Sequence, residues 1–138
     1  IGAGPIVRVG DRLSVFPPEL TNALADIAAG IRKDDPSFGF QRKLMPGGAC
    51  EATAFAGYGI TAACLCLPLG NYHNMADIDG VTAGRTKARV AREYISTADF
   101  HGLVNLLCAA AEGLDHQGPS PRDSMEKIWK DRSYIVRN

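Results

Sequence analysis

The sequence has no excess of either charge, because 15 lysines and arginines balance 15 aspartates and glutamates. Without a basic field, neither nucleic acid nor an anionic membrane surface is expected as a partner. No apolar run approaches the roughly 20 residues that a membrane-spanning helix needs. Aromatic residues reach only 7%, but hydrophobic residues make up 46%, enough for the buried core of one domain. We therefore expect a single unit over residues 1–138.

Cysteine is scarce as well, with four in the chain. Cys64 and Cys66 alternate with Leu65 in an expected strand, so both side chains point to one face. Neighbours on one face of a strand are poorly placed to pair, and one C-x-C without a second cysteine pair makes a poor structural zinc site. We interpret the cysteines as small buried residues of a reduced, cytoplasmic protein. The first residues, IGAGPIVRVG, have no initiating methionine and no signal-peptide layout, so we expect either a start inside a longer protein or a trimmed chain.

Strand-like and helix-like patterns alternate along the chain, which predicts an α/β fold with layers of helices on a sheet. Strands are expected at residues 5–9, 13–16, 38–45, 60–67 and 88–95, with a hairpin turn at Gly10-Asp11 between the first two. A short helix is expected at 50–58, ending at Gly59. A breaker at 117–119 precedes a last short helix that starts at Ser120-Pro121.

Two longer helices carry the apolar stripes expected to form the core. Pro17 and Pro18 open the first, since proline fits the first helical turn. The second starts near Ser96. The predicted buried stripe of the first helix is Leu20, Leu24, Ile27 and Ile31, and that of the second is Phe100, Leu103, Val104, Leu107, Ala111 and Leu114.

The stretch from Met45 to Asn74 is the most informative part of the chain. Gly47 and Gly48 form a turn in which backbone amides can approach a ligand without a Cβ in the way. The apolar run at 60–67 is typical of a central strand covered on both faces. His73 follows that strand, at the carboxyl end where open α/β sheets place their ligands.

The order of GGACEATA, a strand that ends in PLG, and the loop NYHN resembles the C-terminal part of a dinuclear-metal aminopeptidase. The family is that of the glutamyl and tetrahedral aminopeptidases, within the zinc-exopeptidase fold. The resemblance spans residues 4–107 and includes VRVGDRLSVFPPEL and QRKLMPGGACEATAF. It implies a partial three-layer zinc-exopeptidase-like sheet flanked by helices, as a fragment of a larger domain. It also implies a hydrolase that removes N-terminal residues from peptides with two divalent metal ions, zinc or cobalt, and that forms homo-oligomers.

The resemblance also assigns roles to particular residues. His73 would bind one metal ion; the alternative is a loop histidine bonded to a nearby carbonyl. Gly47, Gly48 and Glu51 would line the substrate pocket; alternatively, the glycines form only a tight turn and Glu51 only stabilises the helix N-terminus. Two further residues, Asn71 and Tyr72, would orient the imidazole or line the site.

Most of the motifs such an enzyme needs are absent from the chain, namely the His-x-Asp segment, the bridging aspartate and the Glu-Glu pair with the general base. No catalytic residue is therefore assigned, and we expect this chain alone to be inactive as a peptidase. The alternative hypothesis is a non-catalytic α/β module that binds a small molecule or a partner chain. Under the enzyme hypothesis the glycine turn and the NYHN loop should converge, and under the alternative they should not. The sheet edge left open by a missing half predicts that the chain dimerises, swaps strands or aggregates, unless it covers that edge itself.

Overall fold

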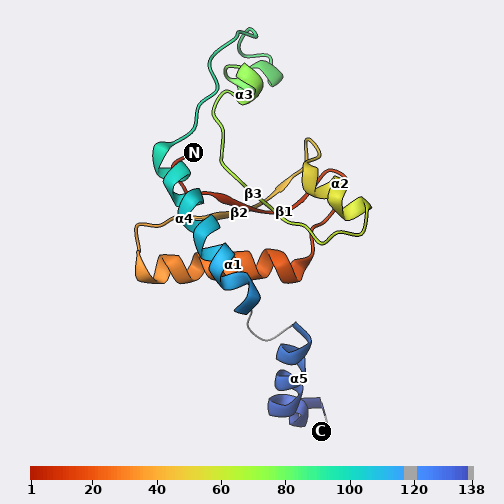
Figure 1. Ribbon diagram of the computed structural model, residues 1–138. Helices are drawn as coiled ribbons and strands as arrows, with labels where there is room; N and C mark the ends of the chain where they lie inside the picture. The colour runs from red at the N-terminus through yellow and green to blue at the C-terminus, as the bar shows by residue number, and fades with distance from the viewer. Residues whose placement is uncertain (117–120, 137–138) are drawn as a thin grey trace.

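A three-stranded sheet forms the centre of the molecule, with its first strand in the middle (Figure 1). The structure is a computed structural model that describes residues 1–116 and 121–136. Strand β1 (Ile6–Asp11) pairs in parallel with β2 (Gln41–Met45) and antiparallel with β3 (Cys64–Cys66). The chain is thus α/β, which confirms the predicted fold class.

Two long helices share the buried core that lies on one face of this sheet. They are α1 (Pro18–Asp34) and α4 (Thr97–Gly113), which contact each other. Proline occupies the first turn of α1, as predicted, and the Ser96 hydroxyl accepts the amide of Asp99 at 3.4 Å to cap α4. The buried core cluster consists of Val7, Leu24, Ala28, Phe38, Leu106 and Ala110.

The predicted stripe of α1 is confirmed, because Leu24 is buried and its companions pack against the core. The predicted stripe of α4 is largely wrong. Leu106 is fully buried, whereas Phe100, Val104 and Leu107 are 45%, 44% and 50% exposed. Apolar residues lie nearly all round α4, so periodicity alone did not identify the face that meets the core.

Three of the predicted strands pair through three residues or fewer, and the predicted strand at 38–45 is shortened to β2, Gln41–Met45. Residues 13–16 form only one bridge, between Gly10 and Val15, after a turn in which the amide of Asp11 donates to the carbonyl of Ser14. The run at 60–67 pairs only at 64–66, and 88–95 forms only isolated bridges. Since β3 is at the edge of the described sheet and its residues are only half-buried, the prediction of a central strand covered on both faces is wrong.

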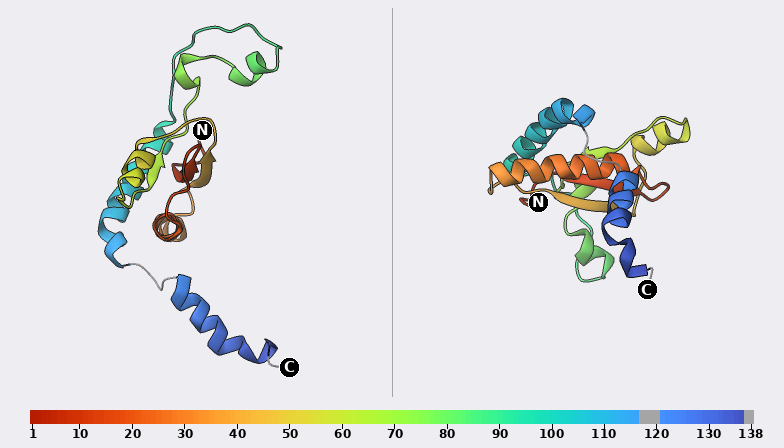
Figure 2. Two further views of the ribbon diagram at one scale, coloured as in Figure 1. Left: turned by 90° about the vertical axis from the view of Figure 1, so that its right-hand side faces the viewer. Right: turned by 90° about the horizontal axis from the view of Figure 1, so that it is seen from below.

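The remaining elements surround the sheet. Helix α2 (Glu51–Gly57) follows the glycine turn as predicted, and Gly59 ends it with a φ of +77°. Residues 70–95, the excursion, project away from the sheet and contain η1 (Tyr72–Asn74) and α3 (Ile78–Thr82) (Figures 1 and 2). The chain ends with η2 (Leu114–His116), α5 (Pro121–Arg132) and η3 (Ser133–Val136). The predicted breaker at 117–119, and Ser120, lie outside the described residues.

Candidate functional site

The glycine turn lies open at the end of β2. The carbonyl of Gly48 accepts the amide of Arg12 at 2.9 Å, which fixes the turn against the end of β1. A Cβ added at Gly47 would meet no atom within 4 Å, and one at Gly48 would meet only the Met45 side chain at 3.8 Å. Neither glycine has a positive φ. The fold of the described chain therefore does not require glycine here, and the exposed backbone is free to approach another molecule.

The carboxylate that organises this region is that of Asp11. Glu51 is exposed in the first turn of α2. Asp11 is only 5% exposed, and one of its oxygens accepts the amide of Cys50 at 2.8 Å and the hydroxyl of Thr53. These bonds hold the N-terminus of α2 against the sheet.

The other Asp11 oxygen accepts the amides of Leu13 at 2.8 Å and Ser14 at 3.0 Å. The hydroxyl of Thr53 and these amides favour the ionised carboxylate and hold the pKa of Asp11 far below its usual range. The sequence pattern placed this residue only in a turn. An aspartate directly after a strand and before a turn was the signal that could have identified it.

The segment that carries His73 has an unusual backbone. Four non-glycine residues within seven positions have left-handed dihedrals, with φ of 52° at Asn71, 56° at His73, 59° at Asn74 and 48° at Asp77. Asparagine, aspartate and histidine tolerate this conformation best, but each such residue still costs on the order of 1 kcal/mol. Strained backbone of this kind clusters at functional sites.

Contacts with the returning strand-like segment hold this backbone in place. The side-chain amide of Asn71 donates to the carbonyl of Arg92 at 2.8 Å. The side-chain oxygen of Asn74 accepts the amide of Glu93 at 3.1 Å, and a carboxylate oxygen of Glu93 accepts the amide of His73 at 3.1 Å. The predicted residues Asn71, Tyr72 and His73 therefore belong to one ordered loop.

The imidazole of His73 lies at the surface of that loop. Its ring centroid is 4.0 Å from that of Tyr72, with the two rings tilted by 47°. The imidazole and the neighbouring Glu93 carboxylate are ligand types that suit zinc. A zinc site in a protein needs at least three protein ligands. Among the described residues no group of three or more histidine, cysteine, aspartate or glutamate side chains could hold a metal ion, so His73 and Glu93 fit only part of such a site.

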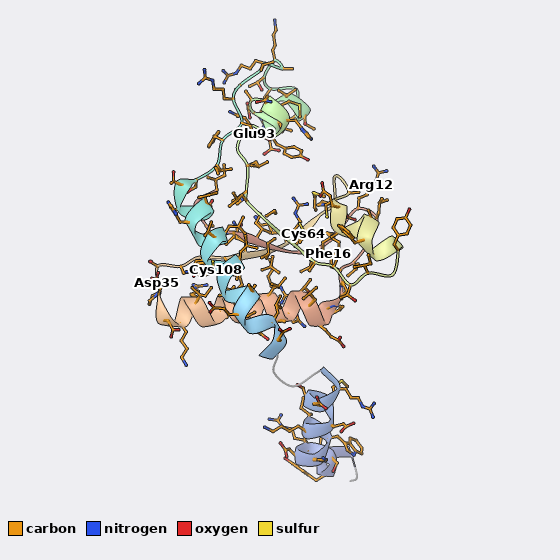
Figure 3. The ribbon with its side chains drawn as sticks, viewed as in Figure 1. Arg12, Phe16, Asp35, Cys64, Glu93 and Cys108 are labelled. Carbon is orange, nitrogen blue, oxygen red and sulfur yellow. The ribbon has the colours of Figure 1, made fainter. Side chains whose placement is uncertain are left out.

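The glycine turn and the His73 loop do not converge. The last residue of β3, Cys66, pairs with Ile6, and Ile6 pairs with Gln41 at the start of β2. The chain to His73 therefore leaves the sheet at the end opposite to the glycine turn. Figure 3 shows the separation through two labelled residues. Glu93, bonded to His73, is on the excursion, and Arg12, bonded to Gly48, is beside α2.

Comparison with known proteins finds likeness at the level of structure only. No protein-family model and no curated protein matches the chain. Among solved structures, the chain matches PhTET1-12s, a TET aminopeptidase with a dodecamer in the asymmetric unit, at a TM-score of 0.52 and 21% identity. The chain shares the fold of part of that protein. The match covers 80% of this chain and 27% of PhTET1-12s, so the chain spans about a quarter of its neighbour.

This likeness supports the α/β, zinc-exopeptidase-like fold expected from the sequence. At 21% identity it shows the fold alone, and the roles assigned to particular residues stay predictions. None of the helices in the described part of the chain has both the length and the apolar character to cross a membrane.

Proposed function

We propose that this chain is part of a metal-dependent aminopeptidase, to which it contributes one metal ligand and part of the substrate pocket. The fold shared with PhTET1-12s over 80% of the chain is the observation that carries the proposal. Two features of the described residues support it. The strained loop presents an exposed imidazole next to a carboxylate, and the glycine turn leaves its backbone open where internal packing does not need it.

In this proposal each predicted residue has a binding or orienting role. His73 binds one of two divalent ions, zinc or cobalt, which when bound activate water and polarise the scissile carbonyl. The amides of Gly47 and Gly48 donate to a substrate carbonyl, and the Glu51 carboxylate attracts the substrate's N-terminal amine. The two other residues of the His73 loop, Asn71 and Tyr72, line the metal side of the pocket.

The described residues do not form a complete pocket. They contain no group of three metal-ligating side chains, and the glycine turn and the His73 loop lie at opposite ends of the sheet. The proposal therefore requires that the remaining ligands and the general base come from elsewhere, in a longer polypeptide or in a neighbouring copy. Assembly into a homo-oligomer is part of the proposal, and the dodecameric state of PhTET1-12s supports it.

A metal titration of the native protein that contains this sequence tests the assignment of His73. His73→Ala should weaken zinc or cobalt binding at least tenfold in isothermal titration calorimetry and should abolish hydrolysis of aminoacyl p-nitroanilides. His101→Ala is the matched control, because His101 is also exposed but lies on α4 against Phe100, at a ring distance of 5.7 Å. Unchanged metal affinity in the His73 variant would refute the assignment.

The second candidate function is a non-catalytic module that binds a small molecule or a partner chain. Two observations favour it. The glycine turn and the His73 loop do not converge, and the His73 ring contacts Tyr72 within its own loop. Under this function, the native protein would bind neither zinc nor cobalt tightly and would hydrolyse no peptide. Calorimetry and the hydrolysis assay therefore separate the two candidates.

A further inference from the structure

The sheet has one face packed by helices and one that carries two adjacent cations. Val7, on the central strand, is fully buried in the core formed with α1 and α4. Its neighbour Arg8 therefore points to the opposite face. Strand register pairs Val7 with Arg42, and the Arg42 guanidinium donates to the side chain of Asn22 on α1 at 2.9 Å. This contact confirms which face the helices cover.

On the opposite face, the cations stand directly across from each other. Arg8 is paired with Lys43 on β2 and with Cys64 on β3. Neighbouring strands lie about 4.8 Å apart, so the two charged side chains emerge close together. Like charges directly opposite on two strands destabilise the sheet. An anion bound between them would remove that repulsion.

The guanidinium of Arg8 is half-buried and oriented by sulfur atoms. Its Nε donates to the Sγ of Cys66 at 3.0 Å, and its Nη1 donates to the Sδ of Met45. Thiol and thioether sulfurs are weak hydrogen-bond acceptors, and a guanidinium has five N–H donors. The Arg8 guanidinium can therefore still donate to a stronger acceptor, such as a carboxylate oxygen. No ion pair between described residues involves Arg8, so no described carboxylate neutralises its charge.

We infer that Arg8 and Lys43 form a binding site for the carboxylate of a peptide or small-molecule ligand on the open face of the sheet. Two donors of a guanidinium match the two oxygens of a carboxylate, and the ammonium of Lys43 adds a second positive charge. The sulfur contacts hold the guanidinium in place before the ligand arrives, which lowers the ordering cost of binding. This site uses no residue of the proposed metal site and does not depend on the proposed function.

Nuclear magnetic resonance on the 138-residue chain provides the test, with sodium succinate as the probe at constant ionic strength. The arginine Nε–H signals report each guanidinium separately. The signal of Arg8 should shift and saturate at millimolar succinate, whereas that of Arg42, on the helix-covered face, should not move. Equal shifts of both signals, or none in either, would overturn the inference.

Three variants and a second anion sharpen the result. Arg8→Met should abolish binding and Lys43→Met should weaken it at least threefold, while Arg42→Met, which removes a neighbouring cation from the other face, should leave it unchanged. Lys43 is exposed, so its variant keeps the test valid even if Arg8→Met does not fold. Binding of phosphate as tightly as succinate would contradict a site shaped for carboxylate.

Discussion

At the scale of single residues, Asp11 connects more of the molecule than any predicted site residue does. Its carboxylate accepts amides from the turn after β1 and from the start of α2, together with the hydroxyl of Thr53. Thr53 also bonds to the hydroxyl of Ser14, at 2.5 Å. The glycine turn lies between these elements, so its position depends on a charged carboxylate at Asp11.

The first prediction concerns Asp11→Asn. The asparagine amide would place a donor where the carboxylate accepts donors, so the variant should unfold at a lower urea concentration at pH 7. Because the folded pKa of Asp11 lies below its unfolded value of about 3.9, the wild-type advantage is present above pH 4 and is lost as pH falls through the folded pKa. In urea titrations at pH 7, 4 and 2.5, the difference in free energy of unfolding between the wild type and the variant should therefore become smaller as the pH falls. Asp26→Asn, at an exposed position on α1, is the control. A stability difference between the wild type and Asp11→Asn that does not depend on pH would contradict this role of Asp11.

A second residue-scale prediction concerns the cysteines. Burial, with a further contribution from the neighbouring Cys50, raises the pKa of the Cys64 thiol to about 11. Only about one such thiol in a thousand is ionised at pH 8, and the thiolate is the reactive form. Cys108 is exposed on α4 (Figure 3). Short iodoacetamide pulses at pH 8, read by mass spectrometry, should label Cys108 well before Cys64. Equal labelling rates would show that Cys64 is not held in this environment.

At the scale of elements, the excursion is closed at its base by one glycine and one tyrosine. The amide of Gly70 donates to the carbonyl of Tyr94 at 2.9 Å, and the amide of Tyr94 donates back at 3.1 Å. A Cβ added at Gly70 would lie 2.2 Å from the Tyr94 ring. Any residue larger than glycine at position 70 would therefore displace the Tyr94 ring. The His73 loop depends on this closure for its position.

Gly70→Ala should therefore open the base of the excursion. Because the Tyr94 ring is 55% exposed and can move aside, the disturbed bridge should destabilise this element locally by about 1 kcal/mol. Hydrogen exchange at the Tyr94 amide should become faster, while exchange in α1 and α4 should not change. Gly57→Ala is the matched control, because an added Cβ there meets no atom within 4 Å. An unchanged exchange rate at Tyr94 in the Gly70 variant would count against this account.

The sequence predicted those elements whose local signals agree with their packing. Pro17 and Pro18 marked the start of α1, and Gly59 marked the end of α2. The face of α4 was not predictable, because its apolar residues surround the helix and the choice of face depends on α1. The length of the third strand was not predictable either, since an apolar run does not reveal how many residues find a partner strand.

The position of the His73 loop along the chain was predictable, but its place relative to the glycine turn was not. The string NYHNMAD contains the residue types that tolerate left-handed backbone, and four of them adopt it. The antiparallel direction of β3 separates this loop from the glycine turn, and strand direction depends on long-range pairing that no local pattern encodes. The contact of Asp99 with the N-terminal segment was not predictable, for the same reason. The buried carboxylate of Asp99 accepts the amides of Gly2 at 2.7 Å and Gly4 at 2.8 Å, both more than 90 residues away in sequence.

At the scale of the whole molecule, the chain exposes more surface than its size allows for a compact monomer. Its accessible surface is 9833 Å², against about 6,900 Å² expected for a monomeric protein of 14.7 kDa. The difference, about 2,900 Å², is larger than the roughly 800 Å² that each partner buries in a standard-size protein–protein interface. Part of the excess is apolar, including the stripe of Phe100, Val104 and Leu107 on α4.

We therefore predict that the chain associates with itself through surfaces that include the α4 stripe. Light scattering between 5 and 200 µM should give an average mass above 14.7 kDa that rises with concentration. The double substitution of Val104 and Leu107 by glutamate should lower that mass, because both side chains are exposed and their loss leaves the core intact. Leu106 is next to Leu107 in sequence but is fully buried. Leu106→Ala should therefore lower the free energy of unfolding by about 2 to 5 kcal/mol without specifically blocking association. A constant mass of 14.7 kDa at all concentrations would mean that the exposed stripe is not an interface between copies of this chain.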